Sequence, residues 1–572
     1  MNTPITTLKA KCRDCHRCIR ACQVKAISLR SGQANVVPEL CISCGLCVEA
    51  CPQKAKTVVS QSDEVLALLG AKENVIVSLA PSYAVAYAEY TPEQVIAGLR
   101  KLGFSRIEET ALAAEAVAAH YCQTLQTSKS TVISSCCPAI VNLLEIYFPE
   151  LMPLLSDSAS PMVIHGRSLR ARYPKAKVVF IGPCIAKIQE ASRPAASGAV
   201  DAVLTFEQLD SMWSKLGINP AELAPMAPDM ATQTATIYPL SRGILSTAGL
   251  QADARPECLA VSGLDSCIEV FKELAKGQIQ PNFIEALACR EGCIDGPGIS
   301  KQQSAAKKRA RLIAYHQERQ KRETSNQQNA RPIATPDNLP RAEYQSRSPE
   351  LATPTEAEIR AILVQIGKHT PEDESNCGGC GYSSCRDKAI ATYRGLAELE
   401  MCVPYMRAKF ESLSHIVVDS SLNAIIVVTK DLLVHQLNPM ADRLFNRNKL
   451  ETKGQHLALF IDPTNFAEVA DSGHALHKQV DYPELKLFTS QIIYPLPDYG
   501  LVIGIISDIT ELENKKQELD KKHRATASRA REVIRNQMKL AQEIAGLLGE
   551  ATAETKATLL ELIASVEEVD EL

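Results

Sequence analysis

The sequence contains no long apolar run, and this absence excludes an integral membrane protein. No stretch approaches the roughly 18 consecutive apolar residues that a membrane-spanning helix needs, and residues 1–10 have no apolar core of a secretory signal. A formal net charge of only −4 also argues against a general nucleic-acid binder. We therefore expect a cytoplasmic protein without membrane insertion and without a nucleic-acid partner.

Cysteine, in contrast, is abundant, with 20 cysteines among 572 residues. Disulfides need a secretory route, which the N-terminus does not indicate, and the cysteines stand in tight runs that are typical of metal ligation. The length predicts several domains, and the hydrophobic fraction of 45% is ordinary for a soluble protein. The pattern of elements predicts a multidomain chain of α/β and α+β class.

Residues 1–60 contain the run C-x2-C-x2-C-x3-C twice, which predicts two 4Fe–4S clusters because soft thiolates at this spacing wrap around one cubane. A zinc site, the alternative, usually shows two separated C-x2-C halves. The fourth cysteine of such a run ligates the other cluster. The expected ligand sets are Cys12, Cys15, Cys18 and Cys51 for one cluster, and Cys22, Cys41, Cys44 and Cys47 for the other. The segment resembles the bacterial two-cluster ferredoxins.

Residues 61–300 alternate strand-like and helix-like segments, which predicts parallel α/β sheets that bind ligands at the carboxyl ends of their strands. Three strand-like runs, residues 75–79, 131–133 and 178–181, are each followed by a short motif whose residue types are typical of functional sites. The residues that follow them include Pro81, Ser82, Cys136, Cys137, Pro183, Cys184 and Lys187. Two further cysteines stand near residue 290, so that Cys137, Cys184, Cys289 and Cys293 could together hold one more cubane.

Three ordered motifs in this segment resemble the signatures of the iron-only (FeFe) hydrogenases. They are Ser134-Ser135-Cys136-Cys137-Pro138, the stretch 182–190 (GPCIAKIQE) and the stretch 287–293 (LACREGC). The resemblance implies an H-cluster, in which the four cysteines named above hold a cubane and Cys293 bridges it to a two-iron unit that carries CO and cyanide. It also implies that Cys136 passes protons, that Lys187 donates a hydrogen bond to a cyanide, and that Pro81, Ser82 and Pro183 contribute to cofactor binding.

The chain also departs from the pattern of the productive enzymes. Gly182 and Leu287 stand where methionines pack on the two-iron unit, and Ile140 stands where a tryptophan is usual. The productive enzymes continue proton transfer through two glutamates about twenty residues before the cysteine pair, whereas residues 115–119 (EAVAA) contain one. Proton transfer needs an unbroken chain of groups within hydrogen-bond reach. We therefore expect slow turnover, and the substitutions look like the sensory branch of the family.

Residues 301–350 are predicted to form a basic helix followed by a flexible linker. In residues 351–410, the spacing C-x2-C-x4-C-x16-C predicts a further 4Fe–4S cluster held by Cys377, Cys380, Cys385 and Cys402. Glycines between the cysteines allow the tight backbone that a cubane needs, and zinc is the alternative. This segment resembles the small 4Fe–4S domain of electron-transfer and corrinoid-linked proteins.

Residues 411–512 resemble a PAS domain, with strands expected at 416–419, 424–431 and 501–506. Residues 513–572 are polar and helical, and their apolar stripes predict a coiled-coil-like coupler that forms a homodimer with the PAS domain. No kinase, phosphatase or DNA-binding motif follows. A signal from this chain would therefore pass to a separate kinase or phosphatase.

Three functions fit these patterns. The first is a slow hydrogenase that interconverts H2 with protons and electrons and senses hydrogen or redox state through its PAS domain. The second is a metabolic, fermentative hydrogenase coupled to ferredoxin or another electron carrier. The third is a non-enzymatic iron–sulfur scaffold that never receives the two-iron unit, and the presence of Cys136, Lys187 and all four cubane ligands argues against it.

Overall fold

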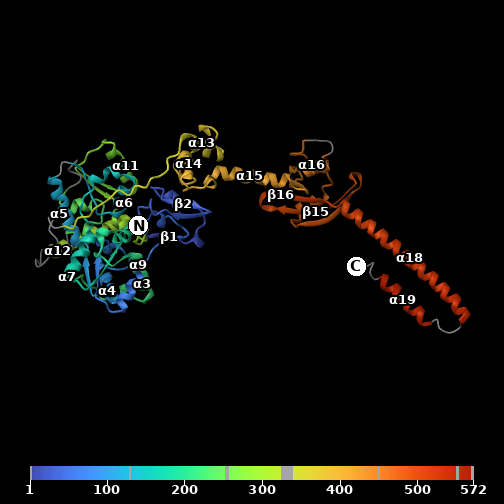
Figure 1. Cartoon of the computed structure of the whole chain (residues 1–572), viewed down its shortest axis with the longest axis horizontal. Helices are drawn as coiled ribbons and strands as arrows, with labels where there is room; N and C mark the ends of the chain where they lie inside the picture. Colours follow the sequence, from blue (N-terminus) through green and yellow to red (C-terminus); the bar gives the residue numbers. More distant parts are fainter. Residues whose placement is uncertain are drawn as a thin grey trace. The chain divides into compact units, whose positions relative to one another are not determined.

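The computed structural model describes residues 3–127, 130–232, 234–250, 257–323, 339–446, 451–548 and 553–567. The chain divides into two compact units, Met1–Met406 and Arg407–Leu572, and Figure 1 labels their helices and strands. Among the described residues, no helix is long and apolar enough to cross a membrane.

The N-terminal part of the first unit is built from two short antiparallel strand pairs and two short helices. Strand β1 (Ile5–Thr7) pairs with β4 (Lys56–Val58), and β2 (Ile27–Arg30) pairs with β3 (Gln33–Val36). Helix α1 (Arg17–Ala21) follows His16 and α2 (Leu46–Glu49) follows Gly45, both in the left-handed region. Each helix contains the third cysteine of its run, Cys18 in α1 and Cys47 in α2, so the two halves have the same arrangement. The ferredoxin-like prediction is confirmed.

Two parallel sheets form the centre of the first unit, which confirms the predicted α/β architecture. The larger sheet has the order β6-β5-β8-β9 and the smaller one the order β10-β11-β7. The larger sheet contains β5 (Val75–Leu79), β6 (Arg106–Glu109), β8 (Lys177–Gly182) and β9 (Ala202–Thr205). The smaller sheet contains β7 (Val132–Ile133), β10 (Cys258–Ser262) and β11 (Phe283–Leu287).

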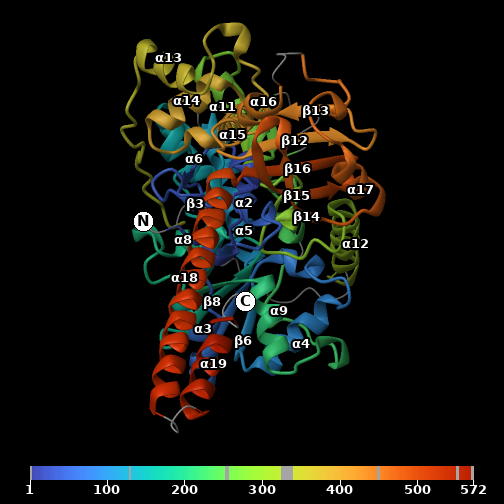
Figure 2. The ribbon, with the colours of Figure 1, turned by 90° about the vertical axis from the view of Figure 1, so that its right-hand side faces the viewer.

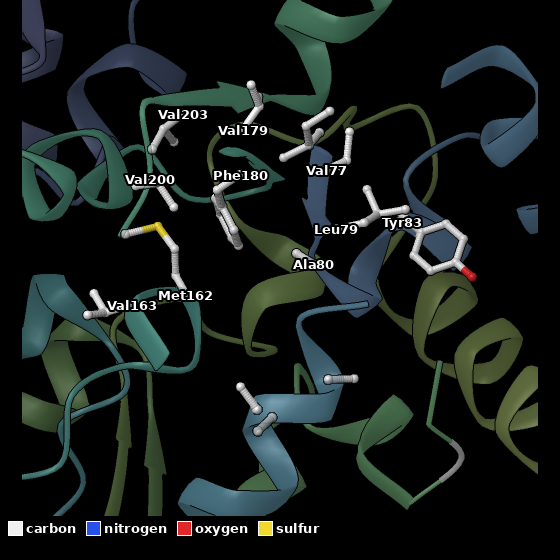
Figure 3. Close-up of a cluster of buried hydrophobic side chains, with 14 of the residues drawn as sticks. Val77, Leu79, Ala80, Tyr83, Met162, Val163, Val179, Phe180, Val200 and Val203 are labelled. Atoms are coloured by element: carbon white, nitrogen blue, oxygen red, sulfur yellow. The ribbon is translucent and has the colours of Figure 1, made fainter. Parts of the chain in front are cut away.

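Helices cover both faces of the larger sheet, and its strands are buried except at Arg106 and Lys177, the half-buried first residues of β6 and β8. The connecting helices are α4 (Pro92–Leu102), α5 (Ala111–Thr127), α6 (Pro138–Tyr147), α7 (Pro161–Arg172), α8 (Ala186–Ala191), α9 (Phe206–Lys215) and α11 (Leu264–Ala275). Thr91 and Thr205 start α4 and α9 with capping boxes that satisfy the first backbone N–H groups. Figure 3 shows part of this core, where Val77, Val179 and Phe180 of the sheet lie among other buried side chains, including Met162 and Val163 of α7.

The segment after the α/β part contacts it over two stretches. Helix α12 (Ala305–Glu323) places the Arg319 guanidinium 2.6 Å from the buried Glu109 carboxylate. Beyond it, the Ala342 N–H donates to the Asp157 carbonyl at 2.8 Å, and Leu339 and Ala342 are buried. Residues 339–347, expected as flexible linker, therefore pack against the α/β part, while the rest of that prediction, at 324–338, lies outside the described residues.

The first unit ends in a small helical module of α13 (Glu356–Gln365) and α14 (Cys385–Tyr393). Helix α15 (Val403–Asp419) starts directly after Cys402. The strand expected at 416–419 is therefore wrong, because these residues form the last turn of α15. A short run of branched apolar residues suits a strand and a helix equally, and here the helix that begins at Val403 extends through it.

The second unit contains a five-stranded antiparallel sheet of order β13-β12-β16-β15-β14, and Figure 2 shows the strands in this order. The strands are β12 (Ala424–Thr429), β13 (Val434–Leu437), β14 (Leu476–Tyr482), β15 (Leu487–Leu496) and β16 (Leu501–Asp508). Helices α16 (Pro439–Phe445) and α17 (Thr464–Ser472) contribute Phe445 and Phe466 to the core beside the sheet. Helices α18 (Thr510–Leu548) and α19 (Ala553–Glu567) follow.

The pair of Arg319 and Glu109 yields a stability prediction. Glu109 is fully buried and also accepts a hydrogen bond of 2.9 Å from the Tyr83 hydroxyl. Arg319→Ala leaves this carboxylate without its cation, so we expect a loss of about 3 kcal/mol of unfolding free energy in denaturant titrations. Lys215→Ala is the control, because its partner Asp63 is exposed, and it should cost less than about 1 kcal/mol. Equal losses in the two variants would contradict a role for Arg319 in holding α12.

Candidate metal centres

A cavity of about 80 Å³ lies where the strands of both parallel sheets end. Strands β5, β7, β8 and β11 point their carboxyl ends toward it, as expected for open parallel sheets. Of the residues predicted from sequence, seven line it: Pro81, Ser82, Cys136, Pro183, Cys184, Lys187 and Cys293. The structure therefore gathers, in one mostly apolar cavity, residues spread over more than two hundred positions of the chain.

The four cysteines expected to share one cubane come from four different segments. Cys137 precedes α6, Cys184 follows β8, Cys289 follows β11, and Cys293 begins a short 3-10 helix. Burial raises the pKa of the Cys289 thiol, and the neighbouring thiols of Cys293, Cys184 and Cys137 raise it further. Thiols in this setting ionise only when a cationic centre compensates them, which suits ligation of iron.

Gly292 makes the approach of Cys293 possible. Its φ of +75° lies in the region that favours glycine, and a Cβ there would lie 2.3 Å from the Pro239 carbonyl oxygen. The Cys293 N–H donates to that same carbonyl at 2.6 Å. The glycine in the third motif therefore allows the chain to lie close enough for Cys293 to face the cavity.

Lys187 brings a positive charge into the cavity wall. Its ammonium lies 2.6 Å from the Glu190 carboxylate and 3.4 Å from the Cys136 carbonyl oxygen. Burial alone would lower the pKa of Lys187, but the Glu190 charge and hydrogen bond outweigh this effect and raise it. The lysine is therefore cationic at neutral pH and can donate toward an anionic group in the cavity.

Two further polar side chains, Cys136 and Ser82, line the cavity with Lys187. The Cys136 thiol is buried, and burial together with the Cys137 and Cys293 thiols raises its pKa, so it is held as a protonated S–H. The Ser82 hydroxyl is fully buried and has no hydrogen-bond partner among the described residues. A buried hydroxyl without a partner is costly unless a bound group accepts its proton.

The sequence reasoning missed several residues of the wall, namely Thr110, Met162, Phe180 and Tyr238. Phe180 lines the cavity because Gly182 lacks a side chain: a Cβ at Gly182 would lie 2.8 Å from the Phe180 ring. Figure 3 shows Phe180 together with Met162 and Ala80. The space that Gly182 leaves open is thus filled by the ring of Phe180, two residues earlier in the same strand β8, which no spacing rule predicts.

The eight N-terminal cysteines separate into two groups in space. One small cavity is lined by Cys12, Cys15, Cys18 and Cys51, and a second one by Cys22, Cys41, Cys44 and Cys47. These are the two sets that the sequence predicts. Lys56 is buried beside the first, where it donates to the Ala34 carbonyl at 2.7 Å, and its charge opposes the burial that raises the pKa of Cys18.

The C-terminal set surrounds a buried lysine that the sequence reasoning also missed. The Lys388 ammonium faces the thiols of Cys380, Cys385 and Cys402, and burial lowers its pKa while these thiols raise it. Cys377 is exposed, and the backbone N–H of Gly379 lowers the pKa of its thiol.

Across the described residues, no three His, Cys, Asp or Glu side chains converge as a site for a single metal ion. The donor chemistry points to clusters instead: four thiols in each N-terminal set, with the Lys56 ammonium near the first, suit an anionic 4Fe–4S cluster with thiolate ligands.

Comparisons with known proteins agree with this arrangement. The family described as iron-only hydrogenase large subunit, C-terminal domain, matches residues 73–297. The periplasmic Fe hydrogenase large subunit of Nitratidesulfovibrio vulgaris is 31% identical over 358 residues, which cover 51% of this chain and 85% of that relative. The chain belongs to the iron-only hydrogenase family. Iron hydrogenase 1 of Clostridium pasteurianum is 28% identical over 369 residues, 51% of this chain and 64% of the relative.

The hydrogenase domain is flanked by two further family matches. A 4Fe–4S dicluster domain matches residues 11–55 and an iron–sulfur cluster domain matches residues 373–404, in agreement with the predicted clusters. The cytosolic Fe–S cluster assembly factor NAR1 of Kluyveromyces lactis is 34% identical over 92 residues, 16% of this chain and 20% of that protein. A variant of the FeFe-hydrogenase HydA1 from Chlamydomonas reinhardtii aligns over 50% of this chain and all of its own, with 20% identity and a TM-score of 0.41.

Residues 115–119 of α5, where the resemblance implies two proton-carrying glutamates, contain one carboxylate, Glu115. Residues 116–119 lie in α5, where Ala116 and Ala118 are buried and carry no titratable group. The Glu115 carboxylate accepts a hydrogen bond from the Thr232 hydroxyl. Among the described residues of this stretch of α5, only Glu115 could carry a proton.

Lys388 yields a test of the C-terminal cluster. A cation beside a buried cluster stabilises its reduced, more negative form, so Lys388→Met should lower the reduction potential. A shift of about 60 mV corresponds to a tenfold change for a one-electron couple. The measurement is a redox titration followed by EPR. Arg386→Met removes a positive charge from the exposed start of α14 and should leave the potential nearly unchanged; an equal shift there would rule out a specific effect of Lys388.

Proposed function

We propose that the chain interconverts H2 with protons and electrons at the cavity beside Cys136, slowly, and that it uses this reaction to sense hydrogen or redox state. The observation that carries the proposal is the position of Cys136 and Lys187 in one cavity wall with Cys184 and Cys293. Cys137, Cys184, Cys289 and Cys293 would hold the cubane of the H-cluster. When bound, the two-iron unit supplies the metal site at which H2 is split or formed.

The residues of the chain have distinct tasks in this proposal. The Cys136 Sγ, which lines the cavity, would hold a proton and exchange it with the group bound there. Lys187 and Ser82 donate hydrogen bonds that orient the group and balance its charge, and Pro81 and Pro183 shape the wall. The apolar side chains of Met162 and Phe180 exclude water, which strengthens each of these polar interactions.

Slow turnover follows from the missing carboxylates of α5. A metabolic hydrogenase coupled to ferredoxin is the alternative, and it would need a fast route for protons. A scaffold related to the assembly factor is disfavoured, because a protein that never binds the two-iron unit has no use for a buried thiol and ammonium in the cavity.

An acidic electron carrier, such as a ferredoxin, fits the surface around the first cysteine set. Cys15 is exposed, and Lys9, Lys11, Arg13 and Arg17 around it are also exposed in a chain of net negative charge. Complementary charge would guide such a carrier to the exposed edge of the cluster. The free thiols favour a reducing, cytoplasmic compartment.

The second unit would act as the signalling module. Its sheet order and the exit of β16 into α18 fit the PAS resemblance. The PAS domain of an HTR-like protein from Haloarcula marismortui aligns over 18% of this chain and 95% of its own, at 12% identity and a TM-score of 0.16, so the resemblance rests on the strand order. Signal output would go to a separate kinase or phosphatase.

The helices that precede and follow this sheet in the chain, α15 and α18, have exposed apolar residues that suit a homodimer. In α15, Val403, Phe410 and Val417 lie seven residues apart and expose 57%, 61% and 67% of their surface. In α18, Leu512, Leu519, Val533 and Leu540 repeat at multiples of seven and are also exposed. A seven-residue apolar period is the seam of a left-handed coiled coil, so a second copy of the chain is the partner that both helices suit.

The catalytic proposal is tested first by infrared spectroscopy of the matured protein and by H2/D2 exchange. We expect CO and cyanide bands and slow exchange, and absence of the bands would end both hydrogenase interpretations. Cys136→Ala should retain the bands and lower the exchange rate at least about 100-fold, since it removes the acid–base group. Cys122→Ala is the control, because Cys122 lies outside the cavity and donates to the Ala248 carbonyl. Exchange that survives in Cys136→Ala would assign the proton to another group.

The dimer is tested by light scattering of the purified chain at micromolar concentration. Phe410→Glu together with Leu519→Glu places charge in both seams and should convert the dimer to a monomer. Ala408→Glu with Ser528→Glu adds the same charge to exposed positions of the same helices outside the seams. A wild-type monomer, or equal dissociation of the control, would refute the seams.

A further inference from the structure

The module that carries the C-terminal cysteine set is docked on the N-terminal domain. The Leu29 N–H donates to the Leu396 carbonyl at 3.0 Å, and the Ser31 N–H donates to the Glu398 carboxylate at 2.6 Å. Arg20 donates at 3.0 Å to the Gly379 carbonyl and at 2.9 Å to the Cys15 carbonyl. Figure 1 shows α13 and α14 beside β2. Contacts from three segments of the N-terminal domain therefore fix this module in one orientation.

The centre of this contact lies next to the cysteines themselves. The Lys25 ammonium, three residues after Cys22, donates to the Gly381 carbonyl at 2.6 Å and lies 5.9 Å from the centre of the Tyr382 ring. It faces the thiols of both Cys22 and Cys380. Tyr382 is buried in the same hydrophobic cluster as Cys22. The set of Cys22, Cys41, Cys44 and Cys47 (the Cys22 set) and the set of Cys377, Cys380, Cys385 and Cys402 (the Cys377 set) thus share one wall.

Another side of the Cys22 set adjoins the hydrogenase cavity. Cys44 packs against the same hydrophobic cluster as Cys137 and Cys184. The Ser43 hydroxyl donates to Gln189 at 2.8 Å, and the Asn142 side chain donates to the Ile42 carbonyl at 3.1 Å. The Cys22 set is therefore a junction between the hydrogenase site and the C-terminal cysteine set.

We propose that the Cys377 set is a side branch of the electron route, joined to the Cys22 set across Lys25, Gly381 and Tyr382, and that its reduction is the readout of H2. The inference rests on the proposed function for its source of electrons.

Oxidation of one H2 gives two protons and two electrons. The protons leave through Cys136, and each electron reduces one oxidised 4Fe–4S site. Electron transfer weakens steeply with distance, so the shared wall makes the branch accessible from the junction. Helix α15 begins one residue after Cys402 and leads to the sheet of the second unit. A change in the redox state of the Cys377 set therefore occurs next to the N-terminus of this helix.

Gly381 and Gly378 offer a matched pair of variants. Both have positive φ in the same loop, at +95° and +68°. A Cβ at Gly381 would lie 2.9 Å from Ile19 Cγ2, whereas a Cβ at Gly378 meets nothing closer than 3.9 Å. Gly381→Ala therefore carries the same type of backbone strain as Gly378→Ala, and it alone pushes the module off the N-terminal domain.

The experiment uses the full chain reconstituted with its 4Fe–4S clusters but without the two-iron unit, reduced by dithionite. We expect EPR of the wild type and of Gly378→Ala to show magnetic coupling between the reduced clusters of the Cys22 set and the Cys377 set, in addition to any coupling within the N-terminal pair, and Cys380→Ser should remove only this additional coupling. Gly381→Ala should retain the signals of all the clusters and lose the additional coupling that involves the Cys377 set. Lys25→Met removes the 2.6 Å hydrogen bond to the Gly381 carbonyl without changing a residue of the loop 377–385, and it should weaken the coupling as well. This variant decides the question if Gly381→Ala fails to bind its cluster.

Coupling that is absent from the wild type, or unchanged in both Gly381→Ala and Lys25→Met, would overturn the side branch. This result does not depend on hydrogenase activity. The matured wild type exposed to H2 tests the source of electrons separately: the cluster of the Cys377 set should become reduced at least tenfold faster than in Lys25→Met. If H2 reduces no cluster at all while the coupling is present, the hydrogenase proposal fails and the branch stands as an electron route for another donor.

Discussion

A buried or half-buried lysine beside each set of cysteines is the interaction on which the rest of the structure depends. Lys187, Lys56, Lys25 and Lys388 each bring an ammonium to one of the four cysteine sets. An iron–sulfur cluster with thiolate ligands is an anion, and an uncompensated charge inside a protein costs several kcal/mol. The fold must therefore deliver a cation and thiols to the same place, and this requirement explains why segments far apart in the sequence meet at each site.

The four lysines reach their sites in different ways, which decides how far each could be predicted. Lys187 stands three residues after Cys184, inside a motif of the family, so the resemblance implies its role. Lys388 stands three residues after Cys385 as well, but its burial depends on α13, which covers α14 from the other side. Lys56 and Lys25 stand outside the cysteine runs. A lysine in a sequence gives no sign of burial, because most lysines are solvated.

Local spacing also explains which parts of the fold could be predicted. The cysteine runs, the strands β5 and β8 and helix α4 depend on neighbouring residues, and their residue types are sufficient to predict them. The cavity wall depends on tertiary contacts instead: Phe180 lies in a strand whose residues are buried on both faces, and only the missing side chain of Gly182 places its ring at the cavity. The strand expected at 416–419 is wrong for a related reason, since branched apolar residues at the end of a long helix look like a strand when the helix start is not recognised.

The missing glutamates of α5 and the docked C-terminal module fit a single design. A productive hydrogenase needs fast transfer of protons and of electrons, and its chain provides a continuous route for each. A protein that reports on H2 needs only enough turnover to set the redox state of a cluster, and it needs that cluster to be held where a conformational element begins. Here residues 115–119 of α5 contain one carboxylate, Glu115, while contacts from three segments hold the Cys377 set on the N-terminal domain. In the proposed sensor, the specific contacts of the chain therefore fix the position of a cluster, and Cys402, the last cysteine of that set, directly precedes α15.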